Sequence, residues 1–202
     1  MTDLPFAPAC ERNRQPIAEA LQQHISQPAR LLEVGSGTGQ HGYYFSEQFP
    51  ELIWQPTDRS ENMAAISQWV AAAQRRNFLT PLCLDVNAPG EVGSDYDYVY
   101  TANTLHIMSW QEVQALAYLL PTLLRADGLL LVYGPFNYDG QFTSDSNARF
   151  DQMLRNSKPH QGIRDFAAVD ELAQSVGLTL LDDMMMPANN RFLVWRYQAS
   201  SV

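Results

Sequence analysis

The segment LLEVGSGTGQHG, residues 31–42, constrains the fold more than any other part of the chain. Gly35, Gly37 and Gly39 alternate directly after a short apolar run and open a pattern typical of a helix. Residues without side chains let a ligand approach the backbone, and the start of a helix presents unpaired N–H groups. The segment therefore predicts a strand, a tight loop and a helix, with room for an anionic group at the loop.

Short β-rich runs alternate with helical patterns from residue 29 to about residue 186. This alternation is typical of α/β proteins, in which crossover helices join parallel strands. The predicted strands are Arg30–Val34, Leu52–Gln55 (ended by Pro56), Thr80–Val86, Tyr96–Thr101, Leu129–Gly134, Thr179–Met186 and Phe192–Tyr197. The predicted helices are Glu11–Ser26, one from Gly39, Glu61–Gln74 with Ser60 as N-cap, Trp110–Leu124, Asp145–Asn156 and Ala168–Val176. Turn-forming residues 187–190 predict that the last two strands form an antiparallel hairpin.

A single domain covering residues 1–202 is the expected organisation, because a chain of 202 residues suits one core. Residues 1–28 are expected to form an N-terminal helical segment before the first strand. Residues 135–165 interrupt the alternation with Gly, Pro, Asn, Asp and Ser clusters around one short helix. Connections of this length are often functional, so we expect a lid-like insertion after the fifth strand.

The charge and composition of the chain argue against several classes of partner and site. The chain has 22 acidic and 13 basic side chains, for a net charge of -9, and a pI near 4.7, so no nucleic-acid partner is expected. Cys10 and Cys83 lie far apart, and no Asp, Glu and His cluster has metal-ligand spacing, so we expect neither a disulfide framework nor a metal. Without a leader pattern or an uninterrupted apolar stretch, a cytoplasmic monomer or homodimer with no membrane association is expected.

Glu33 distinguishes between two ligand classes that such a glycine loop binds. Gly37, Gly39 and Gly42 also fit the G-x-G-x-x-G spacing of dinucleotide-binding enzymes. A pyrophosphate about 6 Å from this carboxylate would be repelled by roughly 3 kcal/mol per unit charge pair at an effective dielectric near 20. S-adenosylmethionine brings an ammonium and a sulfonium instead, so the charge favours the methyl donor over NAD. Alternatively, Glu33 caps local N–H groups or pairs with an arginine such as Arg12.

Two further acids follow the next two predicted strands. Asp58 comes after the second strand, where a carboxylate can accept hydrogen bonds from both hydroxyls of a ribose. Asp85 ends the third strand, where it can accept from an adenine amino group while the N–H of Val86 meets a ring nitrogen. Either aspartate alone is equally consistent with a turn or a helix cap. Together with Glu33 they form a series at three successive strand ends, which favours a cofactor site.

The motif EVGSGTG, with Asp58, LDV and ANTLHI, resembles the class I S-adenosylmethionine-dependent methyltransferases. The motifs ACERNRQPI, LLEVGSGTGQHG, NTLHIMSW, GPFNYDG, RDF and MPANNRFLVWR are more closely similar to the methyltransferase-like family labelled domain of unknown function 938. The resemblance spans essentially the whole chain. It implies a Rossmann-like, mostly parallel sheet of seven strands in the order 3-2-1-4-5-7-6, with a C-terminal antiparallel hairpin and helices on both faces.

The resemblance also implies which residues hold the donor. The implied residues are Glu33, Gly35, Ser36, Gly37, Gly39 and Asn103 at the methionine end, Asp58 at the ribose, and Asp85 and Val86 at the adenine. In this family residues 11–14 lie near the pocket mouth, so Arg12 or Arg14 is expected to meet a carboxylate. The sequence TANTLH departs from the Asn/Asp-Pro-Pro-aromatic pattern of amino-directed DNA and protein-glutamine methyltransferases, which disfavours those substrates.

Methyl transfer from a sulfonium is an in-line displacement, so the protein mainly aligns the acceptor and excludes water. His106, just beyond the fourth strand, is the candidate base when the acceptor must lose a proton; alternatively, it lines the pocket without proton transfer. The expected substrate-binding residues are Arg12, Tyr133, Asn137, Tyr138 and Arg164. We therefore expect an enzyme that methylates a small molecule. The alternatives are a donor-binding module without turnover and an NAD-dependent oxidoreductase.

Overall fold

The computed structural model describes residues 4–199 as a three-layer α/β fold. Seven strands form one sheet in the order β3-β2-β1-β4-β5-β9-β8. Their bounds are β1 Ala29–Val34, β2 Leu52–Asp58, β3 Leu82–Cys83, β4 Tyr96–Ala102, β5 Leu124–Gly134, β8 Leu178–Met186 and β9 Asn190–Tyr197. Neighbouring strands from β3 to β5 are parallel, whereas β9 is antiparallel to both β5 and β8. Counted within this sheet alone, the order is the predicted 3-2-1-4-5-7-6 with its terminal hairpin.

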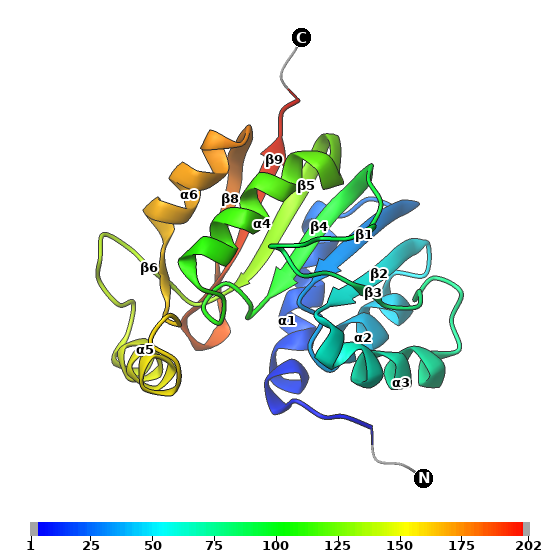
Figure 1. Ribbon diagram of the computed structural model, residues 1–202, viewed down its shortest axis with the longest axis horizontal. Helices are drawn as coiled ribbons and strands as arrows, with labels where there is room; N and C mark the ends of the chain where they lie inside the picture. The colour runs from blue at the N-terminus through cyan, green and yellow to red at the C-terminus, as the bar shows by residue number, and fades with distance from the viewer. Residues whose placement is uncertain (1–3, 200–202) are drawn as a thin grey trace.

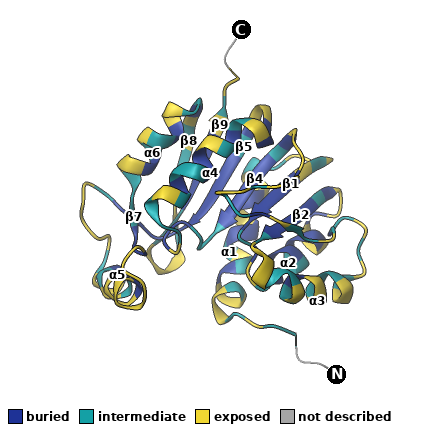
Figure 2. Ribbon diagram, in the orientation of Figure 1, coloured by how far each residue is buried: buried dark blue, intermediate teal, exposed yellow. Residues whose placement is uncertain are grey.

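Helices cover both faces of the sheet (Figure 1). Their bounds are α1 Pro8–His24, α2 Gln40–Gln48, α3 Met63–Ala73, α4 Trp110–Leu123, α5 Asp145–Ser157 and α6 Phe166–Ser175. Short 3-10 turns occupy η1 Ser60–Asn62 and η2 Pro187–Asn189. Apolar side chains of α1 and α2 pack on one face of the sheet, and those of α4 and α6 pack on the other. Figure 2 shows the resulting pattern, with buried strands between helices whose outer faces are exposed.

The predicted end of the second strand at Pro56 was wrong, because β2 continues to Asp58. Trp54, two residues earlier, exchanges backbone hydrogen bonds with Asn77 and Leu79 on the outer side of the strand. Alternate residues of a strand direct their backbone groups to the same side, so the missing N–H of Pro56 also lies there. Pairing with β3 begins only at Thr57, so the proline interrupts no ladder hydrogen bond.

The third strand is shorter than the predicted Thr80–Val86, because only Leu82 and Cys83 pair with β2. The chain then turns at Asp85, whose backbone oxygen accepts from the N–H of Ala88 at 2.9 Å. Ser60, predicted as an N-cap, instead begins the turn η1, and α3 starts at Met63.

The long segment 135–165 carries more structure than the single helix predicted for it. The short strand β6, Phe136–Asn137, precedes α5 in the sequence, and β7, Arg164–Asp165, follows it. These two strands pair in parallel as a separate two-stranded sheet. Residues 1–3 and 200–202 of the predicted single domain lie outside the described residues. The carboxyl ends of the parallel strands, the start of α2, the first turn of α1 and α5 gather at the same end of the molecule (Figure 1).

The start of α4 fixes the loop that follows β4. Ser109 and Glu112 form a capping box: the Ser109 Oγ accepts from the Glu112 N–H at 3.2 Å, and the Glu112 carboxylate accepts from the Ser109 N–H at 2.6 Å. We expect Ser109→Ala to lower the free energy of unfolding by about 1 kcal/mol, because one helix N–H loses its partner. Urea denaturation measures this change. Ser67→Ala, at an exposed position inside α3, is the matched control and should be neutral or slightly stabilising; equal effects of the two variants would contradict the assigned cap.

Candidate functional site

The glycine loop lies at the carboxyl end of β1. The N–H groups of Gly35 and Ser36 both donate to the backbone oxygen of Thr57 at 3.0 Å, which ties the loop to β2. Gly35 has φ +75°, and a Cβ there would lie 2.8 Å from the side chain of Thr104. Gly37 has φ +59°, yet no atom lies within 4 Å of its ideal Cβ position. The backbone at Gly37 therefore borders open space, whereas packing requires the glycine at position 35.

Glu33 is buried under this loop with 2% of its surface exposed. Its Oε2 atom accepts hydrogen bonds from Ser36 Oγ and from Trp54 Nε1, both at 2.8 Å. Burial raises the pKa of Glu33 to about 7; the two hydrogen bonds oppose the rise, and the nearby charge of Asp58 adds to it. Burial therefore disfavours the ionised carboxyl group, which gains from any cation that reaches it.

Asp58 joins the end of β2 to the glycine loop. Its Oδ2 atom accepts from the N–H of Gly37 at 2.7 Å, and its Oδ1 atom accepts from the N–H of Arg59 at 2.7 Å and from Asn62 Nδ2 at 3.0 Å. The backbone oxygen of Asp58 accepts from the N–H of Leu84 at 2.8 Å. These contacts bring the ends of β1, β2 and β3 together, as the series of acids predicts.

Asp85 and Val86 follow β3 in a tight turn. The Asp85 Oδ1 atom accepts from the N–H of Asn87 at 2.9 Å, so the side chain stabilises the turn. The half-buried Val86 packs against the core cluster on the α4 face. The structure thus supports a turn-forming role for Asp85, and its predicted contact with an adenine stays a prediction.

Two predicted residues follow β4 on the other side of β1. Asn103 has φ +56°, and its N–H donates to the backbone oxygen of Tyr133 at 2.8 Å. His106 is 5% exposed, and its ring lies 5.3 Å from that of Phe150 in α5. Burial lowers the pKa of His106 to about 4, and the charge of Arg164 adds to the effect. The imidazole is therefore neutral at pH 7.

The predicted substrate-binding residues fall into separate places. Tyr133 and Asn137 are buried at the end of β5 and in β6. Arg164 donates to the backbone oxygens of Leu105, Met108 and His160, so its guanidinium holds the loop after β4. Tyr138 donates to the Asp183 carboxylate, which holds the segment on β8. Arg12 is exposed on α1.

Sequence reasoning missed a set of buried polar side chains beneath α1. Asn13, next to Arg12, points inward, and its Oδ1 atom lies 2.8 Å from His41 Nε2. The signal was present, because Asn13 precedes Ile17 by four residues and so extends the apolar stripe of α1 by one turn. Tyr100 on β4 is fully buried, and its hydroxyl has no hydrogen-bond partner among the described residues. An unpaired buried hydroxyl costs about 1–3 kcal/mol.

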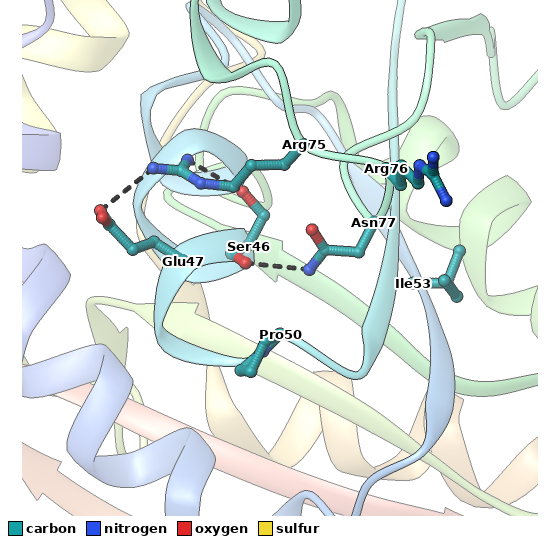
Figure 3. Close-up of a pocket in the computed structure, with 7 residues that line it drawn as sticks. All are labelled: Ser46, Glu47, Pro50, Ile53, Arg75, Arg76 and Asn77. Carbon is teal, nitrogen blue, oxygen red and sulfur yellow. Dashed lines mark hydrogen bonds and ion pairs between the residues drawn. The ribbon is translucent and has the colours of Figure 1, made fainter.

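A hollow lies at the opposite end of β2 from the glycine loop (Figure 3). It measures about 480 Å³ and lies beside the end of α2 and the loop after α3. Asn77 Nδ2 donates to the backbone oxygens of Ser46, Phe49 and Leu52, and Arg75 bonds Tyr43 O and pairs with Glu47 at 3.2 Å. These side chains bond carbonyls at the end of α2 and at the start of β2, so their role at this hollow is structural.

Within residues 4–199, no group of three His, Cys, Asp or Glu side chains is placed to hold a metal ion. No helix among these residues is both long and apolar enough to cross a membrane.

The raised pKa of Glu33 gives a prediction for stability. Because the folded-state pKa lies above the ordinary value of 4.5, the wild-type protein loses stability as the pH rises from about 4.5 to about 7. We expect Glu33→Gln to remove this loss, so its free energy of unfolding relative to wild type should rise by up to roughly 3 kcal/mol between pH 4.5 and pH 8. Urea denaturation at both pH values measures the difference. The exposed Glu91→Gln is the control; a Glu33→Gln difference as flat as the control's would contradict the raised pKa.

Structure comparison finds the fold of methyltransferases. An O-methyltransferase family protein from Burkholderia thailandensis matches with a TM-score of 0.79 and 16% identity, over 96% of this chain and 58% of that one. The S-adenosylmethionine-dependent methyltransferase SibL matches with a TM-score of 0.79 and 18% identity, over 94% and 56%. PigF, solved with SAH, matches with a TM-score of 0.77 and 12% identity, over 92% and 56%. The chain spans less than three-fifths of the length of each of these structures.

A family model described as "Protein of unknown function (DUF938)" matches residues 4–197, almost the whole chain. The protein has a Rossmann-like methyltransferase fold and belongs to the DUF938 family.

Proposed function

We propose that the protein binds S-adenosylmethionine at the carboxyl ends of β1, β2 and β4 and transfers its methyl group to a small-molecule acceptor. The observation that carries the proposal is the buried Glu33 carboxyl directly under the glycine loop. A buried carboxylate favours a cationic ligand group, and the donor has an ammonium and a sulfonium. The fold shared with methyltransferases supports the same function.

Further features of this end of the sheet support the proposal. Gly37 presents its backbone to open space, so a ligand can approach without meeting a side chain. Asp58 holds the N–H of Gly37, and in the proposal it exchanges this bond for the ribose hydroxyls. Asn103 is proposed to line the methionine end, and Asp85 and Val86 to meet the adenine after their turn opens.

The nicotinamide alternative is weaker on the same observation, because a pyrophosphate would lie near the Glu33 charge. The third glycine of its spacing has a separate explanation in this chain. A Cβ at Gly42 would lie 2.4 Å from the Phe78 ring, so this glycine is needed for packing α2 against the segment before β3.

When bound, the donor supplies an electrophilic methyl group, and the chain's own residues must align the acceptor and exclude water. We propose that Tyr133 and Asn137 line the acceptor side, since both are buried at the end of β5 and in β6. Arg164 and Tyr138 hold the covering segment through the contacts described above. The exposed Arg12 is proposed only for the entrance.

His106 is neutral near pH 7 and can accept a proton, although its pKa of about 4 makes it a weak base. This weakness favours one further candidate function, a donor-binding protein without turnover. The two functions differ in outcome, because only an enzyme converts the donor to S-adenosylhomocysteine in the presence of a metabolite extract.

The proposed site predicts which acids determine the affinity for the donor. We expect Glu33→Gln and Asp58→Ala each to weaken S-adenosylmethionine binding by about 10- to 100-fold, because each removes a charged hydrogen-bond partner. Isothermal titration calorimetry measures the affinity. Glu171→Ala, an exposed acid on α6, is the control and should bind as wild type. Wild-type protein that binds NAD but not S-adenosylmethionine would refute the proposal, and unchanged affinity in both variants would refute the site.

The proposed role of His106 as a base predicts an effect on the rate of methyl transfer. If His106 accepts the acceptor's proton, His106→Ala should lower the rate of S-adenosylhomocysteine formation by about 100-fold or more while changing donor affinity less. Mass spectrometry follows the product formed from donor and metabolite extract. His160→Ala, at an exposed position in the long segment 135–165, is the control. An equal loss of rate and of donor affinity would show that His106 supports binding and not proton transfer.

A further inference from the structure

A group of buried polar side chains lies between the first turns of α1, the start of α2 and the carboxyl ends of the central strands. Four side chains form what we call the inner polar cluster: Asn13, His41, Tyr100 and Tyr133. The register of the sheet pairs Tyr100 with Glu33, and Tyr133 with the residue two positions beyond Tyr100. Paired residues of parallel strands, and residues two apart, share a face. Glu33, Tyr100 and Tyr133 therefore lie in one row on the α1 face of the sheet.

Polar groups around the Tyr100 hydroxyl have partners. His41 Nε2 lies 2.8 Å from Asn13 Oδ1. The Glu33 carboxyl accepts from Ser36 and Trp54. The Tyr100 hydroxyl, fully buried beside them, has no hydrogen-bond partner among the described residues.

The Tyr100 ring is held firmly. Its centroid lies 5.6 Å from Trp54, 6.1 Å from Phe45 and 6.3 Å from His41, each in an edge-to-face arrangement. Such packing fixes the ring plane, so the hydroxyl cannot turn away to find another partner. Burial, followed by the charges of Glu33, Cys10 and Tyr133, raises the pKa of Tyr100 well above its ordinary value. The group therefore stays protonated and is available as a hydrogen-bond donor and acceptor.

The charged and neutral groups around Tyr100 suit a zwitterionic ligand. Glu33 is the acid in the row, and the inner polar cluster itself contains phenols, an amide and a neutral imidazole, since burial lowers the pKa of His41 to about 4. Above the row, α1 begins without a side-chain cap. Pro8 has no N–H and the N–H of Cys10 donates to the backbone oxygen of Ala7 at 3.0 Å, so it is the N–H of Ala9 that offers a partner to a carboxylate. Cys10 of this turn feels the charge of Glu33: burial raises its thiol pKa to about 11 and the carboxylate adds to the shift. A small ligand group that carries both a cation, next to Glu33, and an anion, next to the start of α1, matches this arrangement.

We propose that the Tyr100 hydroxyl recognises the amino-acid end of the donor, where it hydrogen-bonds to the ammonium and carboxylate group held next to Glu33. This inference rests on the proposed function and adds a residue that determines ligand specificity. The protein then discriminates between adenosine thioethers that carry an α-amino-acid end and those that lack it.

Two ligands test the discrimination, S-adenosylhomocysteine and 5′-methylthioadenosine, which shares the adenosine and sulfur but has no amino-acid end. We expect Tyr100→Phe to weaken S-adenosylhomocysteine binding by about 10-fold, the effect of one hydrogen bond to a charged group. Binding of 5′-methylthioadenosine should change by less than about twofold, since its contacts do not involve the hydroxyl. Calorimetry with both ligands gives the ratio. The thermal midpoint of Tyr100→Phe should be equal to or above that of wild type, because the lost hydroxyl has no partner to leave behind.

Tyr98→Phe is the matched control, since Tyr98 lies two residues earlier on the same strand and face. Its hydroxyl accepts from the N–H of Ser26 at 2.9 Å at the far end of the strand. It should lower stability and leave the ligand ratio unchanged. Asp58→Ala should weaken both ligands, because both contain the ribose. Tyr100→Phe that leaves S-adenosylhomocysteine binding unchanged, or weakens both ligands equally, would overturn the inference while the proposed function stands; failure of wild type to bind either ligand would overturn the proposed function itself.

Discussion

The buried Glu33 side chain at the end of β1 determines how the glycine loop and β2 are arranged around it. The Glu33 side chain is bonded by a serine of the glycine loop and by a tryptophan of β2, so the loop, β1 and β2 meet at a single oxygen atom. Ionising this group inside the protein is costly, as its raised pKa indicates. Proteins commonly accept such a loss of stability where the group meets a ligand. The same acid thus organises the glycine loop and, in the proposed function, favours a cationic ligand group.

Around this acid, the polar groups on the α1 face are paired across elements that are distant in sequence. Asn13 of α1 meets His41 of α2, and the N-terminal segment also reaches α3, where Trp69 Nε1 donates to the backbone oxygen of Pro5 at 2.8 Å. The N-terminal segment is therefore tied by hydrogen bonds to both α2 and α3. A substitution that loosens α1 will affect the groups beside Glu33 even when it leaves the glycine loop intact.

Much of the architecture followed from local sequence patterns, because each parallel strand is a short apolar run bounded by clear turn signals. The glycine loop and the acids at successive strand ends were likewise predictable, since parallel strands end at one edge. The extent of β2 was not, because the harmlessness of Pro56 depends on where β3 begins to pair. Within the inner polar cluster, Asn13 and Tyr100 also escaped prediction, and Tyr133 was predicted only as a substrate-binding residue. Tyr100 resembles any strand aromatic until the register places its hydroxyl beside Glu33, and Arg164 resembles a ligand-binding arginine until its three backbone partners are seen.

Those partners make the loop after β4 and the returning limb of the long segment one mechanical unit. Arg164 holds the carbonyls of Leu105 and Met108, and the Gly162 N–H donates to the His106 carbonyl at 2.9 Å. The two stretches are some sixty residues apart in the chain, yet neither can shift without breaking hydrogen bonds to the other. Replacing residues 135–165 with the corresponding segment of a relative will therefore misplace His106 unless residues 103–108 are exchanged with it.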